Sequence, residues 1–220
     1  MDDPTASLMV TDGPPQRGRL LALIADYILE HGVSELTLRA LAAGVGSNNR
    51  MLLYYFGSKE RLMAEGILEA VRRFPRLATA LDRLSADDRS FADHPLDARL
   101  HQVWLDIAAD ENEPFLRLFF ELFGLAAHQP DRYGMFLTSV ADWAERVARV
   151  LALAGAQDEA AREIGIEVVA LWRGLQFALL SGTPRAVLDR AHATAARAVA
   201  DRVAAGGSAA TRLPATAALR

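Results

Sequence analysis

The sequence contains no cysteine, which excludes disulfide bonds and metal sites built from thiolates. It also lacks any apolar run approaching the roughly 20 residues of a membrane-spanning helix. Its first 15 residues are acidic and rich in proline, without the basic flank and apolar stretch of a signal peptide. We therefore expect a cytoplasmic protein that makes no contact with a membrane.

Lysine is nearly absent, because Lys59 is the one lysine among 24 basic residues. The formal net charge of -4 argues against a nucleic-acid partner only if the charge is spread evenly. Residues 36–61 contain four cations and one anion, so this segment is positive while the remainder of the chain is acidic. A basic segment in an acidic chain fits a protein with one end that faces DNA.

Sequence patterns for catalysis and metal binding are also missing. The five histidines include no pair four residues apart, and the chain has no glycine-rich phosphate loop and no G-x-S-x-G motif. Carboxylate pairs such as Asp87-Asp88 and Asp110-Glu111 fall in expected loops, where water would solvate them. We predict that the protein is no enzyme and holds neither a metal nor a cofactor.

Apolar residues recur at helical spacing, and no run of alternating β-branched residues indicates a strand. The sequence predicts an all-α fold, with disordered ends at 1–15 and 206–220 and a polar loop at 85–95. The expected helices, bounded by capping residues, glycines and prolines, are 17–31, 38–45, 48–56, 59–74, 96–109, 114–128, 131–154, 158–181 and 184–205. We expect a DNA-binding domain at 16–62 and a helical effector-binding and dimerisation domain at 63–205.

The three short helices before residue 57 match a helix-turn-helix, with Gly46 in the turn. The helix that enters the major groove must be short, capped and polar on its outer face. Residues 48–56 fit this description, because Leu52 and Phe56 can anchor one side while Asn49, Arg50 and Tyr54 face outward. Asparagine can read adenine, and arginine can read guanine.

Residues 37–62 resemble the signature of the tetracycline-repressor (TetR) family without a gap. The shared features are a threonine that opens the second helix, an Ala-Gly-Val turn, a Tyr-Tyr-Phe ending and a Ser-Lys-Glu start of the fourth helix. The resemblance implies that Lys59 contacts the DNA backbone, where a helix N-terminus already favours phosphate. The expected DNA-binding residues are Thr37, Arg39, Asn48, Asn49, Arg50, Met51, Tyr54, Tyr55 and Lys59.

Two positions depart from the family pattern. Asn48 stands at the usual serine cap, which changes little because both residues cap helices well. Leu53 stands where the family usually has a tyrosine that contacts phosphate, so Tyr54 or Tyr55 would have to supply that contact.

The helical part after residue 63 has two expected roles. The first is an apolar effector pocket with a few polar groups, although an aromatic stripe such as Phe115 to Phe123 also fits ordinary core. The candidate pocket residues are His101, Trp104, Phe119, Phe123, His128, Trp143, Trp172 and Gln176.

The second role is a homodimer interface of four helices, two from each subunit. Packing within one chain would explain the same apolar stripes, but a short recognition helix needs a second copy for adequate affinity. Near Gly174 and Leu175, the sequence is loosely similar to the family's dimer-forming helix. The candidate interface residues are Ile164, Val168, Leu171, Leu175, Leu179, Val187, Ala191, Ala195 and Val199.

These observations predict a DNA-binding transcription regulator, a repressor that a small-molecule effector releases from a palindromic operator. Two alternatives stay open at this stage. One is an activator or nucleoid-type protein that needs no effector. The other is a helical enzyme or lipid carrier whose helix-turn-helix is vestigial.

Overall fold

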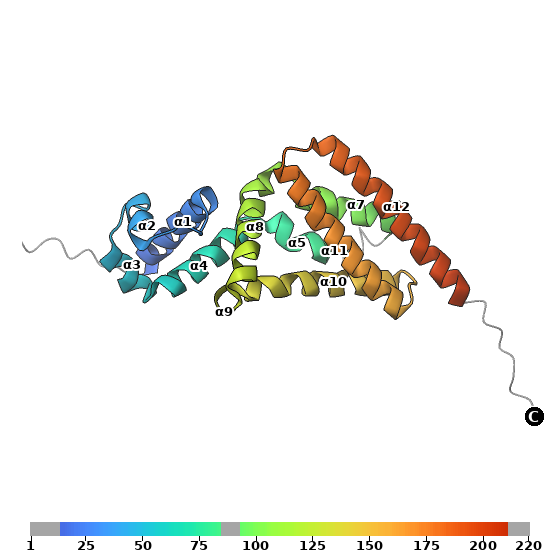
Figure 1. Cartoon of the computed structure of the whole chain (residues 1–220), viewed down its shortest axis with the longest axis horizontal. Helices are drawn as coiled ribbons and strands as arrows, with labels where there is room; N and C mark the ends of the chain where they lie inside the picture. The colour runs from blue at the N-terminus through green and yellow to red at the C-terminus, as the bar shows by residue number, and fades with distance from the viewer. Residues whose placement is uncertain (1–13, 85–92, 211–220) are drawn as a thin grey trace, which may run out of the picture. The chain divides into compact units, whose positions relative to one another are not determined.

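The computed structural model describes residues 14–84 and 93–210, and within these ranges the chain forms helices and no strand (Figure 1). The all-α prediction is confirmed. Of the tails expected at 1–15 and 206–220 and the loop expected at 85–95, residues 1–13, 85–92 and 211–220 lie outside the described residues. The other parts of the two tails need a correction, because residues 14–15 belong to the first helix and residues 206–210 to the last. None of the described helices combines the length and the apolar character that a bilayer crossing requires.

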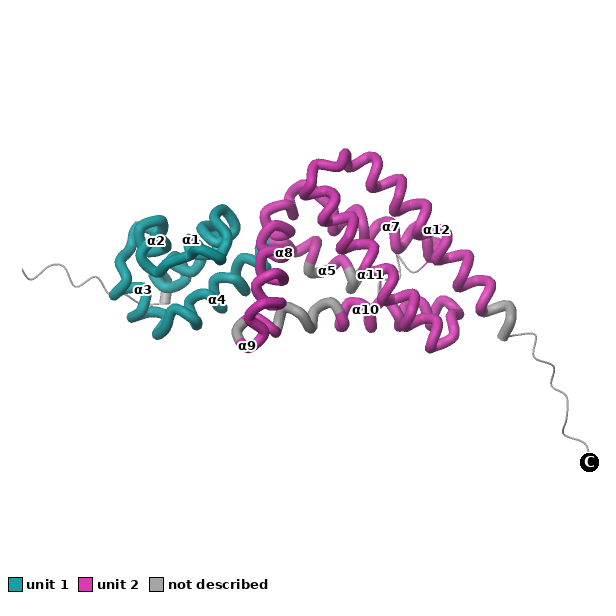
Figure 2. The backbone as a smooth tube through the Cα atoms, in the orientation of Figure 1, with its two compact units in different colours: residues 1–73 teal, residues 74–220 magenta. Residues whose placement is uncertain are grey.

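The first of two units ends at Arg73 (Figure 2). Each of its later helices begins at a side chain that accepts a backbone N–H three residues ahead: Thr37 from Ala40 (3.1 Å), Asn48 from Met51 (3.0 Å) and Ser58 from Arg61 (3.2 Å). Its helices are α1 (Pro14–His31), α2 (Leu38–Gly44), α3 (Asn49–Phe56) and α4 (Lys59–Arg72).

The core of this unit forms where α4 lies against α1. A Cβ atom at Gly66 would come within 2.7 Å of Ile24 and 2.8 Å of Ile28, so only glycine permits this approach. The whole of α4 therefore belongs to the first unit, which extends beyond the domain boundary expected at residue 62. The turns on either side of α3 place Gly46 and Gly57 at positive φ (65° and 80°).

The second unit begins at Phe74. Its elements are α5 (Pro75–Leu84), α7 (Leu96–Ile107), a 3₁₀ turn (Asp110–Asn112), α8 (Glu113–His128), α9 (Pro130–Tyr133), α10 (Met135–Leu153), α11 (Asp158–Leu180) and α12 (Arg185–Ala210). Two further parts of this unit differ from the prediction. Helix α5 occupies residues for which no helix was expected, and Pro75 can open it because the first turn of a helix needs no N–H from that position. The expected helix 131–154 is divided at Gly134 into α9 and α10.

Within the second unit, α10 and α11 pack closely as an antiparallel pair. A Cβ atom at Gly165 would lie 2.6 Å from the carbonyl oxygen of Ala144, so the backbones of the two helices meet at this glycine. Helix α12 packs instead against α7, and α7 packs against α5. At the end of α7, the buried amide of Asn112 donates to the carbonyls of Asp106 (2.7 Å) and Ile107 (3.1 Å). The last carbonyls of an α-helix need donor partners from outside the helical ladder, so this contact closes the C-terminus of α7.

Candidate DNA interface and sensor site

Helix α3 presents a polar outer face and buries its apolar one. Leu52 and Phe56 are fully buried, whereas Asn49 and Arg50 are exposed and Tyr54 is 73% exposed. Both ends of this eight-residue helix are fixed, by the Asn48 cap and by Gly57. Among the other expected DNA-binding residues, Thr37, Arg39 and Asn48 are exposed, and Met51, Tyr55 and Lys59 are half-buried.

Arg17 of α1 holds α3 in place, a role that the sequence did not reveal. Its Nε donates to the carbonyl of Tyr55 at 3.2 Å, and its guanidinium lies 4.8 Å from the ring centre of Phe56. It also forms an ion pair with Glu65 of α4. The same carboxylate lies 3.0 Å from Nε of Arg61. Burial acts to raise the pKa of Glu65, but the hydrogen bonds from Arg17 and Arg61 lower it on balance. The recognition helix is therefore fixed to both of its neighbours.

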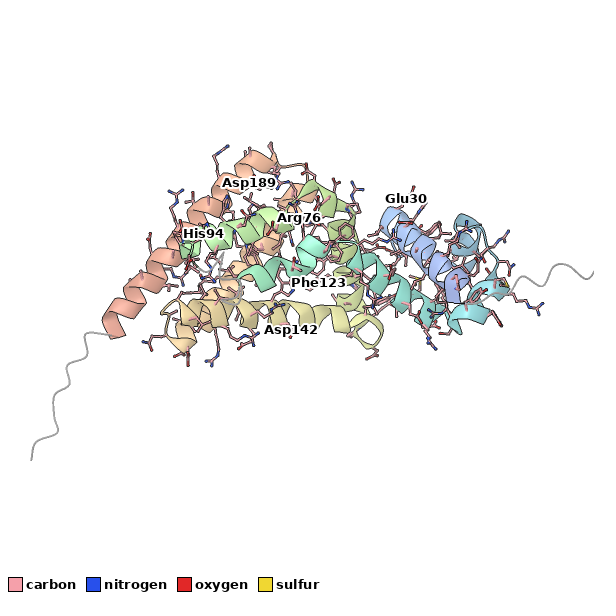
Figure 3. All side chains as sticks on the ribbon, turned by 180° about the vertical axis from the view of Figure 1, so that it is seen from behind. Glu30, Arg76, His94, Phe123, Asp142 and Asp189 are labelled. Carbon is pink, nitrogen blue, oxygen red and sulfur yellow. The ribbon has the colours of Figure 1, made fainter. Side chains whose placement is uncertain are left out.

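In the second unit, rings from α7 and α11 stack around His192 of α12. The His192 ring lies nearly parallel to Trp104 of α7 (12°, centroids 5.5 Å apart) and to Trp172 of α11 (18°, 6.4 Å). His101 of α7 stacks on it at 5.3 Å. Trp104 also donates to the carboxylate of Asp189 at 2.7 Å. Asp189 (labelled in Figure 3) lies one turn before His192 on α12. We call His101, Trp104, Trp172 and His192 the histidine cluster.

Hydrogen bonds fix the proton positions in the histidine cluster. The Trp172 indole N–H donates to His192 Nε2 at 2.8 Å, because an indole nitrogen can only donate. Neutral His192 must then carry its proton on Nδ1, which lies 3.1 Å from Nδ1 of His101. His101 accepts at that atom and carries its own proton on Nε2. The two hydrogen bonds therefore have the same direction: Trp172 of α11 donates to His192 of α12, which donates to His101 of α7.

His192 is buried in its neutral form. Burial, reinforced by repulsion from His101, lowers the pKa of His192 from 6.5 to about 3. Below pH 6.5 the unfolded chain takes up a proton at this histidine and the folded chain does not, so stability falls as pH decreases until about pH 3. The loss is about 1.4 kcal/mol per pH unit, hence about 2 kcal/mol between pH 6.5 and 5.

Between pH 7 and pH 5, we expect the free energy of unfolding of the variant His192→Gln to fall by about 2 kcal/mol less than that of the unchanged chain. Glutamine can still accept the Trp172 N–H, but it does not titrate. Urea unfolding followed by tryptophan fluorescence measures the difference, because all three tryptophans lie in the second unit. Titration of carboxylates affects both proteins alike and cancels. An equal pH dependence in the two proteins would contradict a neutral buried His192.

A second group of side chains surrounds Arg173 of α11. Its guanidinium lies 4.1 Å from the ring centre of Phe119 on α8 and 5.0 Å from that of Trp143 on α10, within the range of cation–π attraction. It also donates to Oε1 of the buried Gln176 at 2.9 Å. Burial lowers the pKa of Arg173 to about 10, which leaves the side chain protonated at neutral pH. We call Phe119, Trp143, Arg173 and Gln176 the Arg173 cluster.

The two clusters bring together most of the expected pocket residues. Trp143 and Trp172 join them by an edge-to-face contact at 6.2 Å, and Phe123 stacks on Phe119 at 6.0 Å. His128 is a correction, because it is exposed and its Nδ1 lies 3.0 Å from the Gly124 carbonyl of its own helix. The sequence missed Arg173 and His192, whose aromatic partners lie on other helices.

The expected dimer residues also need a correction. Ile164, Val168 and Val199 are buried within the chain (3%, 4% and 8% exposed), so they serve internal packing and cannot present a surface. The outer face of α11 carries Ile166 and Phe177 instead, which are 62% and 61% exposed. From the predicted set, Val187 and Ala191 are exposed and the remaining members, Leu171, Leu175, Leu179 and Ala195, are half-buried.

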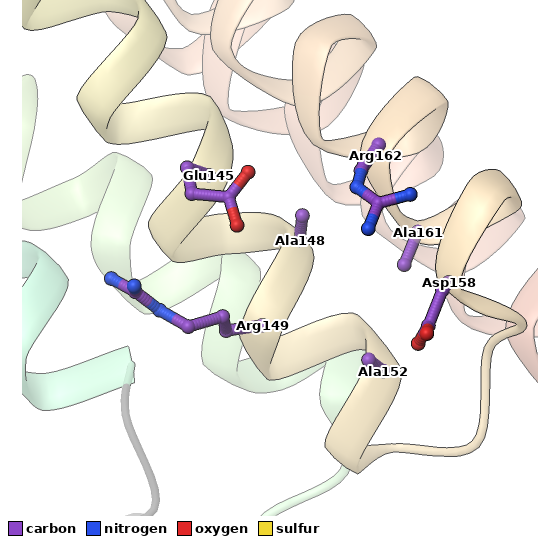
Figure 4. A pocket seen from close by; sticks show the side chains of 7 residues that line it. All are labelled: Glu145, Ala148, Arg149, Ala152, Asp158, Ala161 and Arg162. Carbon is purple, nitrogen blue, oxygen red and sulfur yellow. The ribbon is translucent and has the colours of Figure 1, made fainter.

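A small hollow of about 170 Å³ lies between α10 and α11, and no residue of either cluster lines it (Figure 4). Its lining is charged and open to solvent, and it contains none of the expected pocket residues. The residues that line it are Glu145, Ala148, Arg149, Ala152, Asp158, Ala161 and Arg162.

Comparisons with known proteins agree with this architecture. Residues 20–65 match the sequence profile of the bacterial regulatory proteins of the tetR family. No curated protein sequence matches the chain. Among solved structures, a TetR-family transcriptional regulator from Rhodococcus sp. is 18% identical (TM-score 0.60) and covers 86% of this chain and 98% of its own.

Two further structures share the fold. A TetR-like regulator from Rhodococcus sp. RHA1 is 21% identical (TM-score 0.60) and covers 87% of this chain and 96% of its own. The multidrug binding protein EbrR, in complex with imidazole, is 24% identical (TM-score 0.56) and covers 93% of this chain and 94% of its own. The profile match falls on the capped helices of the first unit, and residues 20–65 carry the helix-turn-helix region of the bacterial regulatory proteins of the tetR family.

Proposed function

We propose that the protein is a homodimeric repressor, bound to a palindromic operator until a small molecule occupies its second unit. The observation that carries the proposal is the outer face of α3, where Asn49, Arg50 and Tyr54 are exposed on a helix fixed by caps and by Arg17. Asparagine and arginine are the side chains that read adenine and guanine in the major groove.

A dimer supplies the second reading helix. Two-fold symmetric regulators read half-sites about 34–36 Å apart, one turn of DNA, so a palindrome reflects the symmetry of the protein. The exposed apolar residues Ile166, Phe177 and Val187 on α11 and α12 support an interface formed by these helices.

An effector would act through the state that it prefers. Helix α4 starts at Lys59, beside the recognition helix, and ends at Arg72, with two residues before α5 of the second unit. A ligand that binds one conformation of the second unit more tightly would shift the protein toward that conformation, and this change would reach the first unit along the short connection. DNA binding would weaken by the difference in the ligand's affinity for the two conformations. EbrR, which shares the fold, binds multiple drugs according to its description, and this supports a small-molecule effector here.

The test uses an operator selected by the purified protein from random DNA. We expect Arg50→Ala to weaken binding to the selected operator by about 1–3 kcal/mol and to leave binding to random DNA nearly unchanged. Lys59→Ala should weaken binding to both and reduce the salt slope by about one unit per subunit. Fluorescence anisotropy at several salt concentrations measures both effects.

Arg162→Ala removes an exposed arginine of α11 and serves as the matched control, which should bind like the unchanged protein. Equal losses on operator and random DNA in Arg50→Ala would remove this residue from base reading. Failure to select any sequence would contradict the repressor and favour a vestigial helix-turn-helix.

A further inference from the structure

The Arg173 guanidinium is a half-buried charge, with its Nε fully buried, and it has no carboxylate partner among the described residues. Its contacts are the rings of Phe119 and Trp143 and the amide oxygen of Gln176. A buried charge is costly unless an opposite charge or several hydrogen bonds compensate it. Two aromatic faces and one neutral acceptor compensate a guanidinium with five N–H groups only in part.

The hydrogen-bonding groups left without a partner in the Arg173 cluster are both donors. Arg173 Nε and Gln176 Nε2 are buried and have no acceptor among the residues that the structure describes. The orientation of the Gln176 amide is settled, because arginine only donates and the atom it meets must be the carbonyl oxygen. Each buried donor without a partner loses the hydrogen bonds that water would give it, which destabilises the folded chain. The cluster therefore lacks acceptors, and it lacks negative charge.

A carboxylate supplies both missing features. It only accepts hydrogen bonds, it carries a negative charge, and arginine binds it with two parallel N–H groups. The rings of Phe119 and Trp143 beside Arg173 would contact the apolar body of such a molecule, with Phe123 (labelled in Figure 3) extending the aromatic wall. A water molecule could fill an acceptor position but would bring no charge.

We propose that the Arg173 cluster binds the carboxylate of a small aromatic acid, and that aromatic acids are the effector class. This inference rests on the proposed function, because it names the ligand of the proposed switch. Gln176 is fully buried, and its neighbour Phe177 is 61% exposed. One turn of α11 thus joins the ligand-facing side to the proposed dimer face. An acid that moves Gln176 moves the surface presented to the partner copy.

The experiment titrates the full-length protein with benzoate and with its neutral analogue benzamide, using tryptophan fluorescence and calorimetry. We expect benzoate to bind at least about tenfold more tightly than benzamide, because only benzoate offers charge-assisted acceptors. Arg173→Met keeps the length of the side chain and should remove this preference. Equal binding of the two compounds, or an unchanged preference in Arg173→Met, would overturn the proposal.

Gln176→Glu is the second variant, and its expected effect comes from an added interaction rather than from a lost one. It places a carboxylate beside Arg173 at nearly the same size, so the pair compensates itself. We expect a higher melting temperature together with at least about tenfold weaker benzoate binding. A higher melting temperature with unchanged benzoate affinity would show that the cluster is structural and would overturn the proposal.

Operator binding is measured in the same samples, which separates the two hypotheses. Release of the selected operator by benzoate, and weaker benzoate binding when operator is present, supports both. Benzoate binding with the same affinity in both conditions keeps the site but overturns its role as the effector site. A selected operator that is bound normally, combined with no benzoate binding, overturns the ligand class and leaves the DNA-binding function standing.

Discussion

The variant Phe177→Glu is expected to be a monomer in solution, whereas we expect the unchanged chain to be a dimer. Phe177 lies on the outer face of α11 with Ile166, and both are more than half exposed. A glutamate there would bring a charge without a partner into the proposed interface, at a cost of several kcal/mol. Because a monomer reads one half-site alone, affinity for the operator should fall by roughly 100-fold or more. Size-exclusion chromatography with light scattering and an operator titration measure the two effects.

Leu153→Glu provides the matched control for this variant. Leu153 is 76% exposed at the end of α10, outside the face that Ile166 and Phe177 form, and the substitution is of the same kind. It should remain a dimer with normal operator affinity. If Phe177→Glu also remains a dimer, the interface lies elsewhere on the chain. Phe177 is a better probe than Leu175, one of the candidate interface residues from the sequence, because Leu175 is half-buried within the chain.

The DNA-binding unit could be predicted almost completely from the sequence, because its signals are local. Thr37, Asn48 and Ser58 each cap a helix by accepting an N–H three residues ahead, so the sequence shows both the cap and its target. The exposure of Asn49 and Arg50 follows from the same helical period that buries Leu52.

The sensor unit could be predicted only in outline, because its important contacts join distant residues. His101 and His192 are 91 positions apart, and nothing near either residue indicates the other. The apolar stripes of α11 and α12 were visible, but periodicity does not say whether a stripe faces its own chain or a partner. Ile164 and Val168 pack inside, while Ile166, on the opposite side of the same helix, is exposed.

Helix α11 is the element on which the two proposed roles of the second unit depend. Its inner side carries Trp172 and Gln176, its outer side carries Phe177, and its first half lies against α10. The position of α11 is therefore expected to influence both ligand binding and dimer formation. Its closest approach to another helix is at Gly165, where the Cβ position is 2.6 Å from a backbone oxygen of α10.

Gly165→Leu is accordingly expected to destabilise the second unit by about 3 kcal/mol, at the upper end of the range for overpacking. The neighbouring atoms are the backbone oxygen of Ala144 and the backbone nitrogen of Ala148, so no side chain can turn aside to make room. The melting temperature should fall by roughly 6–12 °C in a chain of this length. Thermal unfolding followed by tryptophan fluorescence measures this change, because the tryptophans all lie in the second unit.

Gly124→Leu makes the same substitution on the exposed side of α8, where a Cβ atom would meet nothing within 4 Å. It should leave stability unchanged or raise it by up to about 1 kcal/mol, because leucine favours a helix more than glycine does. In Gly165→Leu, the first unit keeps all of its own contacts. At temperatures where the second unit is still folded, this variant should therefore bind random DNA like the unchanged chain. Equal melting temperatures for the two variants would show that α10 and α11 are not in close contact at Gly165, and the arrangement of both clusters on α11 would then have to be redrawn.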